Sequence, residues 1–196
     1  MTPRRETWEA RYANTCESAP QAAPVLRQHA YLLPPEGDAL DVACGRGGNA
    51  LLLAERGLRV TAWDISSHAI KALIAGAERR GLPLNAQVRD VEARPPAPNS
   101  FDAITVSRFL ARELCPHLRA ALRPQGVLYY QTFVRAKATQ TGPANPEYLL
   151  DDNELLSLFA GMRILVYRDE GTQGDRQCGV RNEAWLVAQQ RNRESQ

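Results

Sequence analysis

Strand and helix patterns alternate along the middle of the chain, and this alternation limits the folds open to it. Short apolar runs that read as buried strands are separated by segments with helical spacing, and glycine or proline marks most junctions. The clearest helix follows Ser66 or Ser67 and ends at Gly81. Repeated strand–helix–strand units predict a parallel sheet covered by helices on both faces. The expected strands are 39–43, 58–65, 84–90, 101–107 and 126–133.

The helix expected between the last two of these strands has four leucines on one face and is broken by Pro124-Gln125-Gly126. The leucines are Leu110, Leu114, Leu118 and Leu122. Residues 134–150 are polar and predict a long loop, and the following short helix ends at Gly161. Two strand-like runs, 163–167 and 183–188, predict a closing antiparallel hairpin.

We therefore expect an α/β fold, a three-layer Rossmann-like sandwich. Its mostly parallel seven-stranded sheet would have the antiparallel C-terminal hairpin at one edge. Residues 36–190 form the expected domain, residues 1–35 wrap it as helix and loop, and residues 191–196 form a frayed tail.

Composition excludes several classes of protein. The chain of 196 residues is 44% hydrophobic and 23% charged, as in soluble globular proteins. No apolar run is long enough to span a bilayer, and the N-terminus does not resemble a secretory signal, so we expect a cytoplasmic protein without a membrane partner. A formal net charge of +2 gives no support for nucleic-acid binding. The four cysteines have no metal-ligand spacing, so we expect free thiols and no metal site.

The stretch "DVACGRGGNA", residues 41–50, predicts a ligand-binding turn between a strand and a helix. Glycine permits positive φ and close approach of a ligand, and the following helix presents unpaired N–H groups. Ligands of open parallel sheets bind beyond the carboxyl ends of the strands. Asp41, Asp64 and Asp90 lie at the ends of three successive strands, so we expect them in one crevice. Any one of them alone is equally well explained as a cap of its turn.

Two cofactors fit this turn. Gly45-x-Gly47-x-x-Ala50 satisfies the loose dinucleotide fingerprint, and Asp64 lies where a ribose-binding acid is expected, so an NAD(P)-dependent oxidoreductase is an alternative. Against it, no Tyr-x-x-x-Lys pair follows the fourth or fifth strand, and Asp41 would repel a pyrophosphate. S-adenosyl-L-methionine has no phosphate and carries a sulfonium, an ammonium and a ribose diol. Asp41 would face its positive methionine end, Asp64 its ribose hydroxyls and Asp90 its adenine amino group.

The same residues carry a family resemblance. "DVACGRGGNALLLAERGLRVTAWDIS" resembles motifs I and II of the class I (Rossmann-like) methyltransferases, with Ala43 where many members have glycine. "VRDVEA", "FDAITV" and "LRAALRPQGVLYYQTF" resemble the later motifs, so the resemblance covers about residues 36–133. "WEARY" at 8–12, "GRGGNAL" and the "QTF" ending look closest to the small bacterial tellurite-resistance and thiopurine-type branch.

The resemblance implies a set of residues that surround S-adenosylmethionine. The glycine loop would hold the methionine part, the acids and their neighbours the nucleoside, and the segment after the fourth strand the methyl-transfer face. An N-terminal segment would close over the cofactor, although simple packing explains that segment equally well. The implied cofactor contacts are Trp8, Tyr12, Asp41, Ala43, Cys44, Gly45, Gly47, Asn49, Asp64, Ile65, Ser66, Asp90, Val91, Ser107, Arg108 and Phe109.

Methyl transfer is an in-line displacement from a good leaving group, so the protein mainly aligns the reactants and excludes water. A soft sulfur, selenium or tellurium nucleophile needs no strong base, and the sequence shows none; the catalytic candidates are Arg108, Thr132 and Tyr12. An anionic acceptor would suit Arg108, Arg112 or Arg135. Ser107-Arg-Phe-Leu110 lacks the Pro-Pro-aromatic signature of nucleic-acid amino-methyltransferases. We predict a methyltransferase for a small-molecule acceptor, with a cofactor-binding protein without turnover as a further alternative.

Overall fold

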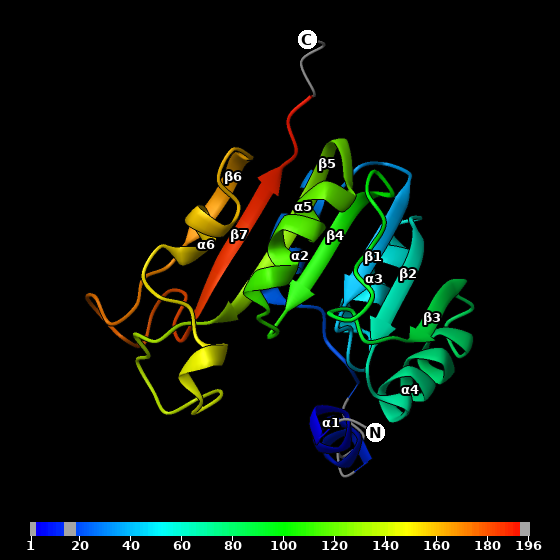
Figure 1. Ribbon diagram of the computed structural model, residues 1–196, viewed down its shortest axis with the longest axis horizontal. Coiled ribbons are helices and arrows are strands. Elements are labelled where there is room, and N and C mark those ends of the chain that lie inside the picture. Colours follow the sequence, from blue (N-terminus) through cyan, green and yellow to red (C-terminus); the bar gives the residue numbers. More distant parts are fainter. Residues whose placement is uncertain (1–2, 14–18, 193–196) are drawn as a thin grey trace.

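The computed structural model describes residues 3–13 and 19–192. Seven strands form one central sheet in the order β3-β2-β1-β4-β5-β7-β6 (Figure 1). The first five strands are parallel, and β7 runs antiparallel to both β5 and β6. The predicted mostly parallel seven-stranded sheet with an antiparallel edge is therefore confirmed. The strands are β1 Asp38–Val42, β2 Arg59–Asp64, β3 Leu84–Val88, β4 Phe101–Ser107, β5 Leu122–Phe133, β6 Arg163–Arg168 and β7 Glu183–Gln189.

Helices cover both faces of the sheet because successive strand residues point to opposite sides. One hydrophobic core contains Leu40, Val42 and Ile104 with residues of α5 and α6, which lie in front of the sheet in Figure 1. The other contains Ala39 and Ala103 with residues of α2, α3 and α4. The helices are α1 Pro3–Ala13, α2 Pro24–His29, α3 Gly48–Glu55, α4 Ser67–Glu78, α5 Cys115–Ala121 and α6 Glu154–Leu158, with 3-10 turns η1 Ala30–Leu32, η2 Arg112–Leu114 and η3 Pro146–Tyr148.

The sequence prediction was wrong about the segment before β5. Leu110 precedes η2, and Leu122 begins β5, so neither belongs to α5. Pro124-Gln125-Gly126 lies inside β5, where Gln125 has φ +66° and the register with β4 shifts. A β-bulge accommodates Pro124, because proline has no N–H to donate and the bulge leaves the regular hydrogen-bond ladder interrupted there. All four leucines are buried. Their hydrophobic pattern is therefore the same for one long helix as for the observed succession of a turn, a helix and a strand.

The described part of residues 1–35 contains the helices α1 and α2 and the turn η1. The side chains of Val25 and Leu26 in α2 pack in the core against the sheet, whereas α1 lies beside α4 beyond the carboxyl ends of β1, β2 and β4 (Figure 1). The domain boundaries at 36 and 190 stay predictions, and residues 193–196 of the expected tail lie outside the described residues. Within the described part of the chain, no helix is long and apolar enough to cross a membrane. A cytoplasmic location stays a prediction.

Candidate cofactor and acceptor site

The loop between β1 and α3 has backbone conformations and close contacts that require glycine. Gly45 has φ +54° and Gly47, the N-cap of α3, has φ +81°. A Cβ on Gly47 would lie 2.1 Å from Cδ1 of Leu73 in α4, and one on Gly48 would lie 2.2 Å from the carbonyl oxygen of Gln21. Ala43 also has positive φ, +50°, a conformation that glycine adopts without steric cost. The loop therefore needs glycine both for its backbone conformation and for its close packing.

The Asp41 side chain forms hydrogen bonds that hold this loop to the neighbouring elements. Its carboxylate is fully buried and accepts hydrogen bonds from the Ala50 N–H at 3.0 Å, the Thr105 hydroxyl at 2.9 Å and the Asn49 amide at 3.4 Å. Burial raises the pKa of Asp41 to about 7, against the lowering effect of these hydrogen bonds. Asp41 thus joins β1, α3 and β4, and its contact with the methionine end of a cofactor stays a prediction.

Asp64, at the end of β2, lies directly against the glycine loop. Its Oδ2 accepts a hydrogen bond from the Gly45 N–H at 2.8 Å, and its Oδ1 accepts one from the Ser66 N–H at 2.9 Å. The side chain is buried, and burial raises its pKa. The structure thus brings together the loop and the acid that the sequence predicted to share one crevice.

Asp90, the third acid of the predicted crevice, forms hydrogen bonds within its own turn. Oδ1 of Asp90 accepts hydrogen bonds from the N–H groups of Glu92 at 3.1 Å and Ala93 at 3.2 Å, so it caps the turn after β3. Val91 is buried in the hydrophobic core with Trp63. The cap that the sequence left open as an alternative is therefore present at Asp90. A contact of Asp90 or Val91 with adenine stays a prediction.

The segment after β4 is tied to the glycine loop. Oγ of Ser107 accepts a hydrogen bond from the Asn49 amide at 3.2 Å. Arg108 follows with φ +53° and an exposed side chain, and the carbonyl of Phe109 accepts a hydrogen bond from the Tyr130 hydroxyl at 2.9 Å. Thr132 is only 1% exposed, so this catalytic candidate has almost no surface that an acceptor can reach in this structure.

Helix α1 covers the glycine loop from above. Trp8 and Tyr12 stack with ring centroids 5.8 Å apart, and a Cβ on Gly45 would lie 2.6 Å from the Tyr12 hydroxyl. Burial and the nearby Asp64 carboxylate raise the pKa of Tyr12, so its phenol stays neutral at pH 7. Burial likewise raises the pKa of the Cys44 thiol. Ile65 is partly exposed next to Asp64.

Comparison with known proteins shows what part of the chain resembles. Residues 39–126 match a family described as methyltransferase domain. A ubiquinone biosynthesis O-methyltransferase of Coxiella burnetii is 32% identical over 101 residues, which cover 49% of this chain and 43% of that protein. Residues 39–126, slightly less than half of the chain, thus resemble a methyltransferase domain.

Solved structures of this methyltransferase fold match nearly the whole chain. One, described as converting a disulfide bond into a thioacetal group during echinomycin biosynthesis, has a TM-score of 0.72 at 24% identity, with 98% of this chain and 94% of that chain covered. TehB from Haemophilus influenzae has a TM-score of 0.69 at 21% identity, with 94% and 67% covered. At these identities the likeness concerns the fold. The chain spans less than half the length of the curated relatives it first matches.

The sequence did not predict two polar clusters at the candidate site. Glu9 of α1 accepts hydrogen bonds at the N-terminus of α4 from the Ser66 hydroxyl at 2.8 Å and from the N–H groups of Ser67 at 2.8 Å and His68 at 3.2 Å. Burial tends to raise the pKa of Glu9. These hydrogen bonds and the His68 ring nevertheless hold that pKa well below its usual range. The run Ser66-Ser67-His68 signalled a helix start without showing which distant acid would bind it.

The second cluster lies where β4, β5 and β7 meet. Gln131 is 1% exposed; its oxygen accepts a hydrogen bond from the Val25 N–H at 2.9 Å, and its amide donates to Glu183. Glu183 also accepts a hydrogen bond from Nε of Arg108 at 2.7 Å. This contact follows from the antiparallel placement of β7, which brings its first residue to the carboxyl end of β5.

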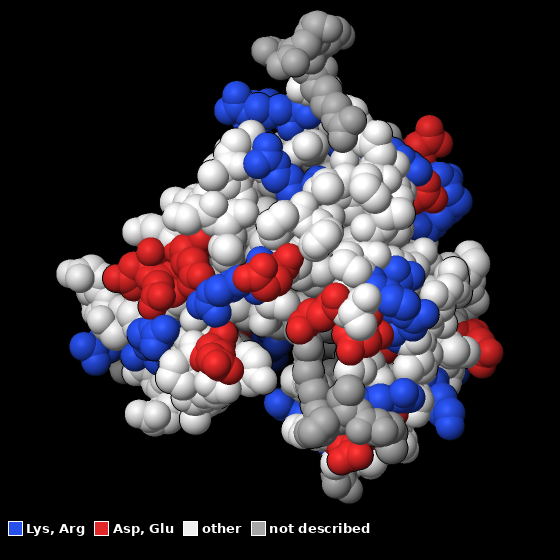
Figure 2. Space-filling view, in the orientation of Figure 1, with Lys and Arg blue, Asp and Glu red and all other residues white. Residues whose placement is uncertain are grey.

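Charge is mixed over the face of the protein shown in Figure 2, where acidic and basic side chains lie close to one another. Nucleic-acid-binding surfaces gather lysine and arginine into a patch or stripe. This face of the described chain therefore offers no extended basic surface.

Proposed function

We propose that this protein transfers the methyl group of S-adenosylmethionine to a small-molecule acceptor by in-line displacement. The observation that carries the proposal is the hydrogen bond between Asp64 and the Gly45 N–H. It joins the loop expected to hold the methionine part to the acid expected to hold the ribose. A single ligand with both parts, separated by no phosphate, fits this arrangement of buried carboxylates around a glycine loop.

The residues present fit this cofactor. Because Gly47 and Gly48 have no side chains, the loop can pack directly against Leu73 and the Gln21 carbonyl. Asp64 can accept hydrogen bonds from the ribose hydroxyls, and loop N–H groups can bind the carboxylate. The Asp41 carboxyl group lies beneath the loop, where it would face the positive end of the methionine part. When bound, S-adenosylmethionine supplies a methyl group on a sulfonium, which is a good leaving group.

The chain's own contribution is alignment and exclusion of water. Trp8 and Tyr12 cover the loop from α1, and the Glu9 contacts fix α1 on α4. Arg108, which directly follows Ser107, has an exposed and charged side chain. The segments directly after β4 and β5, residues 108–111 and 134–136, contain no histidine, cysteine or acid. This composition favours an acceptor that is nucleophilic without a strong protein base, such as a thiolate or an oxyanion of selenium or tellurium.

Thermal unfolding separates cofactor classes. S-adenosylhomocysteine should raise the melting temperature through binding to the folded state, whereas NAD(P)H should not. Stabilisation by NAD(P)H alone would favour the oxidoreductase and overturn the proposal.

Methyl transfer itself needs a second assay. The protein is incubated with methyl-labelled S-adenosylmethionine and a panel of thiols, selenite and tellurite, and then with cell extract. We expect label in at least one small-molecule fraction. Binding of S-adenosylhomocysteine without transfer to any acceptor would show a cofactor-binding protein without turnover.

A further inference from the structure

The structure distinguishes the three arginines that the sequence offered for an anionic acceptor. Arg112 binds both oxygens of Glu154, at 2.6 and 2.9 Å, and the carbonyls of Glu147 and Leu149, so all three of its nitrogens are engaged. Arg135 uses Nε toward Asp151 at 2.7 Å, but both side chains of this pair are exposed, so no buried group holds the arginine in place. Arg108 uses only Nε, toward Glu183. Among the described residues, neither terminal nitrogen of Arg108 makes a hydrogen bond.

A buried carboxylate, that of Glu183, holds the Arg108 side chain in place. The Glu183 side chain is 11% exposed, whereas that of Arg108 is 64% exposed, so the pair joins a buried carboxylate to an accessible guanidinium. Gln131 fixes the second oxygen of Glu183 and is itself bound to Val25. The guanidinium carbon also lies 5.8 Å from the ring centre of Phe133. An arginine anchored through Nε presents its two terminal nitrogens as a fork, the geometry that binds an oxyanion in two places.

The backbone of Arg108 lies next to the proposed cofactor site. Arg108 follows Ser107, which is bonded to Asn49 of the cofactor loop region. Its φ of +53° is rarely adopted by residues other than glycine, and such conformations concentrate at functional sites. The N–H of Arg108 donates to the Gln131 carbonyl at 2.8 Å, which fixes the turn.

The loop 134–150 packs on the same ring that Arg108 approaches, because a Cβ on Gly142 would lie 2.5 Å from Cδ1 of Phe133. In this loop, Lys137, Thr139 and Gln140 line a pocket of about 510 Å³ together with Arg135, and neither Arg108 nor Phe133 is among its lining residues.

We propose that the methyl acceptor carries an oxyanion group, such as a carboxylate or a phosphate, and that the terminal nitrogens of Arg108 bind it. This inference rests on the proposed function, because it concerns the acceptor of that reaction. Glu183 holds the arginine through Nε, and the anion binds at the two terminal nitrogens that this contact leaves available.

The test uses the protein loaded with S-adenosylhomocysteine and two probes of the same shape, benzoate and benzamide, titrated by calorimetry. Wild type should bind benzoate about tenfold more tightly than benzamide, because a charged bidentate contact is lost with the amide. Arg108→Gln should abolish this preference, and Arg108→Lys should restore part of it by keeping the charge without the fork.

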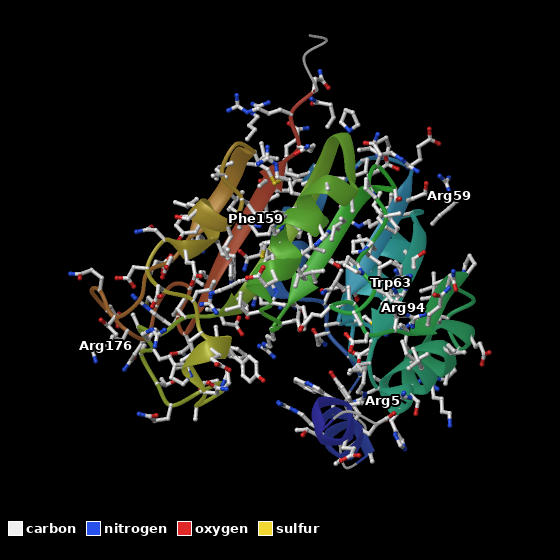
Figure 3. All side chains as sticks on the ribbon, in the orientation of Figure 1. Arg5, Arg59, Trp63, Arg94, Phe159 and Arg176 are labelled. Carbon is white, nitrogen blue, oxygen red and sulfur yellow. The ribbon has the colours of Figure 1, made fainter. Side chains whose placement is uncertain are left out.

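Arg59 supplies a matched control. Its Nε also binds one carboxylate oxygen, on Asp38 at 2.8 Å, and its side chain is 70% exposed, but it lies at the opposite end of the sheet from α1 (Figure 3). Arg59→Gln removes the same charge and should keep the benzoate preference. Equal benzoate affinity in Arg108→Gln and wild type, or no preference in wild type, would overturn the inference alone. If S-adenosylhomocysteine fails to bind wild type, the proposed function and the inference both fall. Circular dichroism and the Lys variant guard against misfolding.

Discussion

Two glycines with the same backbone conformation but different surroundings allow the packing of the cofactor loop to be measured. Gly47 has φ +81° and a Cβ there would lie 2.1 Å from Leu73, whose side chain is fully buried. Gly57 has φ +86° at the end of α3, and nothing lies within 4 Å of a Cβ built there. Replacing each by alanine therefore adds the same conformational strain, but only Gly47→Ala adds a clash.

The expected magnitudes follow from these geometries. Alanine in the left-handed region costs roughly 1–2 kcal/mol at either position. Overpacking a buried side chain adds about 1–3 kcal/mol at Gly47, because Leu73 must change position. Gly47→Ala should thus lower the free energy of unfolding by about 2–5 kcal/mol in total and Gly57→Ala by about 1–2 kcal/mol. For a chain of this size each kcal/mol corresponds to a melting temperature change of roughly 2–4 °C.

Urea unfolding of both variants, followed by circular dichroism, gives the two values directly. S-adenosylhomocysteine affinity, measured in parallel, should fall in Gly47→Ala and stay unchanged in Gly57→Ala, since only the first change shifts the loop. Equal destabilisation by the two substitutions would refute the reasoning, because it would show that the loop does not depend on close contact with α4.

Three further predictions concern carboxylates. Asp64→Ala should weaken S-adenosylhomocysteine binding by about 1–3 kcal/mol through loss of charged hydrogen bonds, measured by calorimetry; unchanged affinity would leave Asp64 as a cap only. Because burial raises the pKa of Asp41 to about 7, the folded state holds this proton more tightly than the unfolded chain does. Its contribution to stability, up to about 4 kcal/mol, is present below about pH 4 and is lost as pH rises to 7. Asp41→Asn should flatten the dependence of unfolding free energy on pH over this window, and an unaltered slope would contradict the assignment. Glu9→Gln should loosen α1 and speed proteolytic cleavage there, with Glu6→Gln, an exposed change on the same helix, as the control.

Local patterns explain which elements could be predicted. The strand of β1, the glycine turn and the start of α4 at Ser66 each depend on residues a few positions apart, and the structure has them where the sequence placed them. The segment from Leu110 to Leu122 could not be assigned correctly in the same way. Its leucines are buried whether the backbone is helical or extended, so the hydrophobic spacing carried no information about the backbone.

The sequence by itself determined the class of fold and the composition of the cofactor loop. Alternating strand and helix periods allow only a covered parallel sheet, and the carboxyl ends of its strands must then share an edge, so Asp64 could be placed near Gly45 in advance. Only the tertiary structure decided which side chains are accessible and which charges are paired. Thr132 became buried, and Arg112 and Arg135 were bound by other acids. Glu183 reached Arg108 across 75 residues because β7 inserts beside β5. Such pairings depend on strand order and on the packing of the whole chain, and no local spacing encodes them.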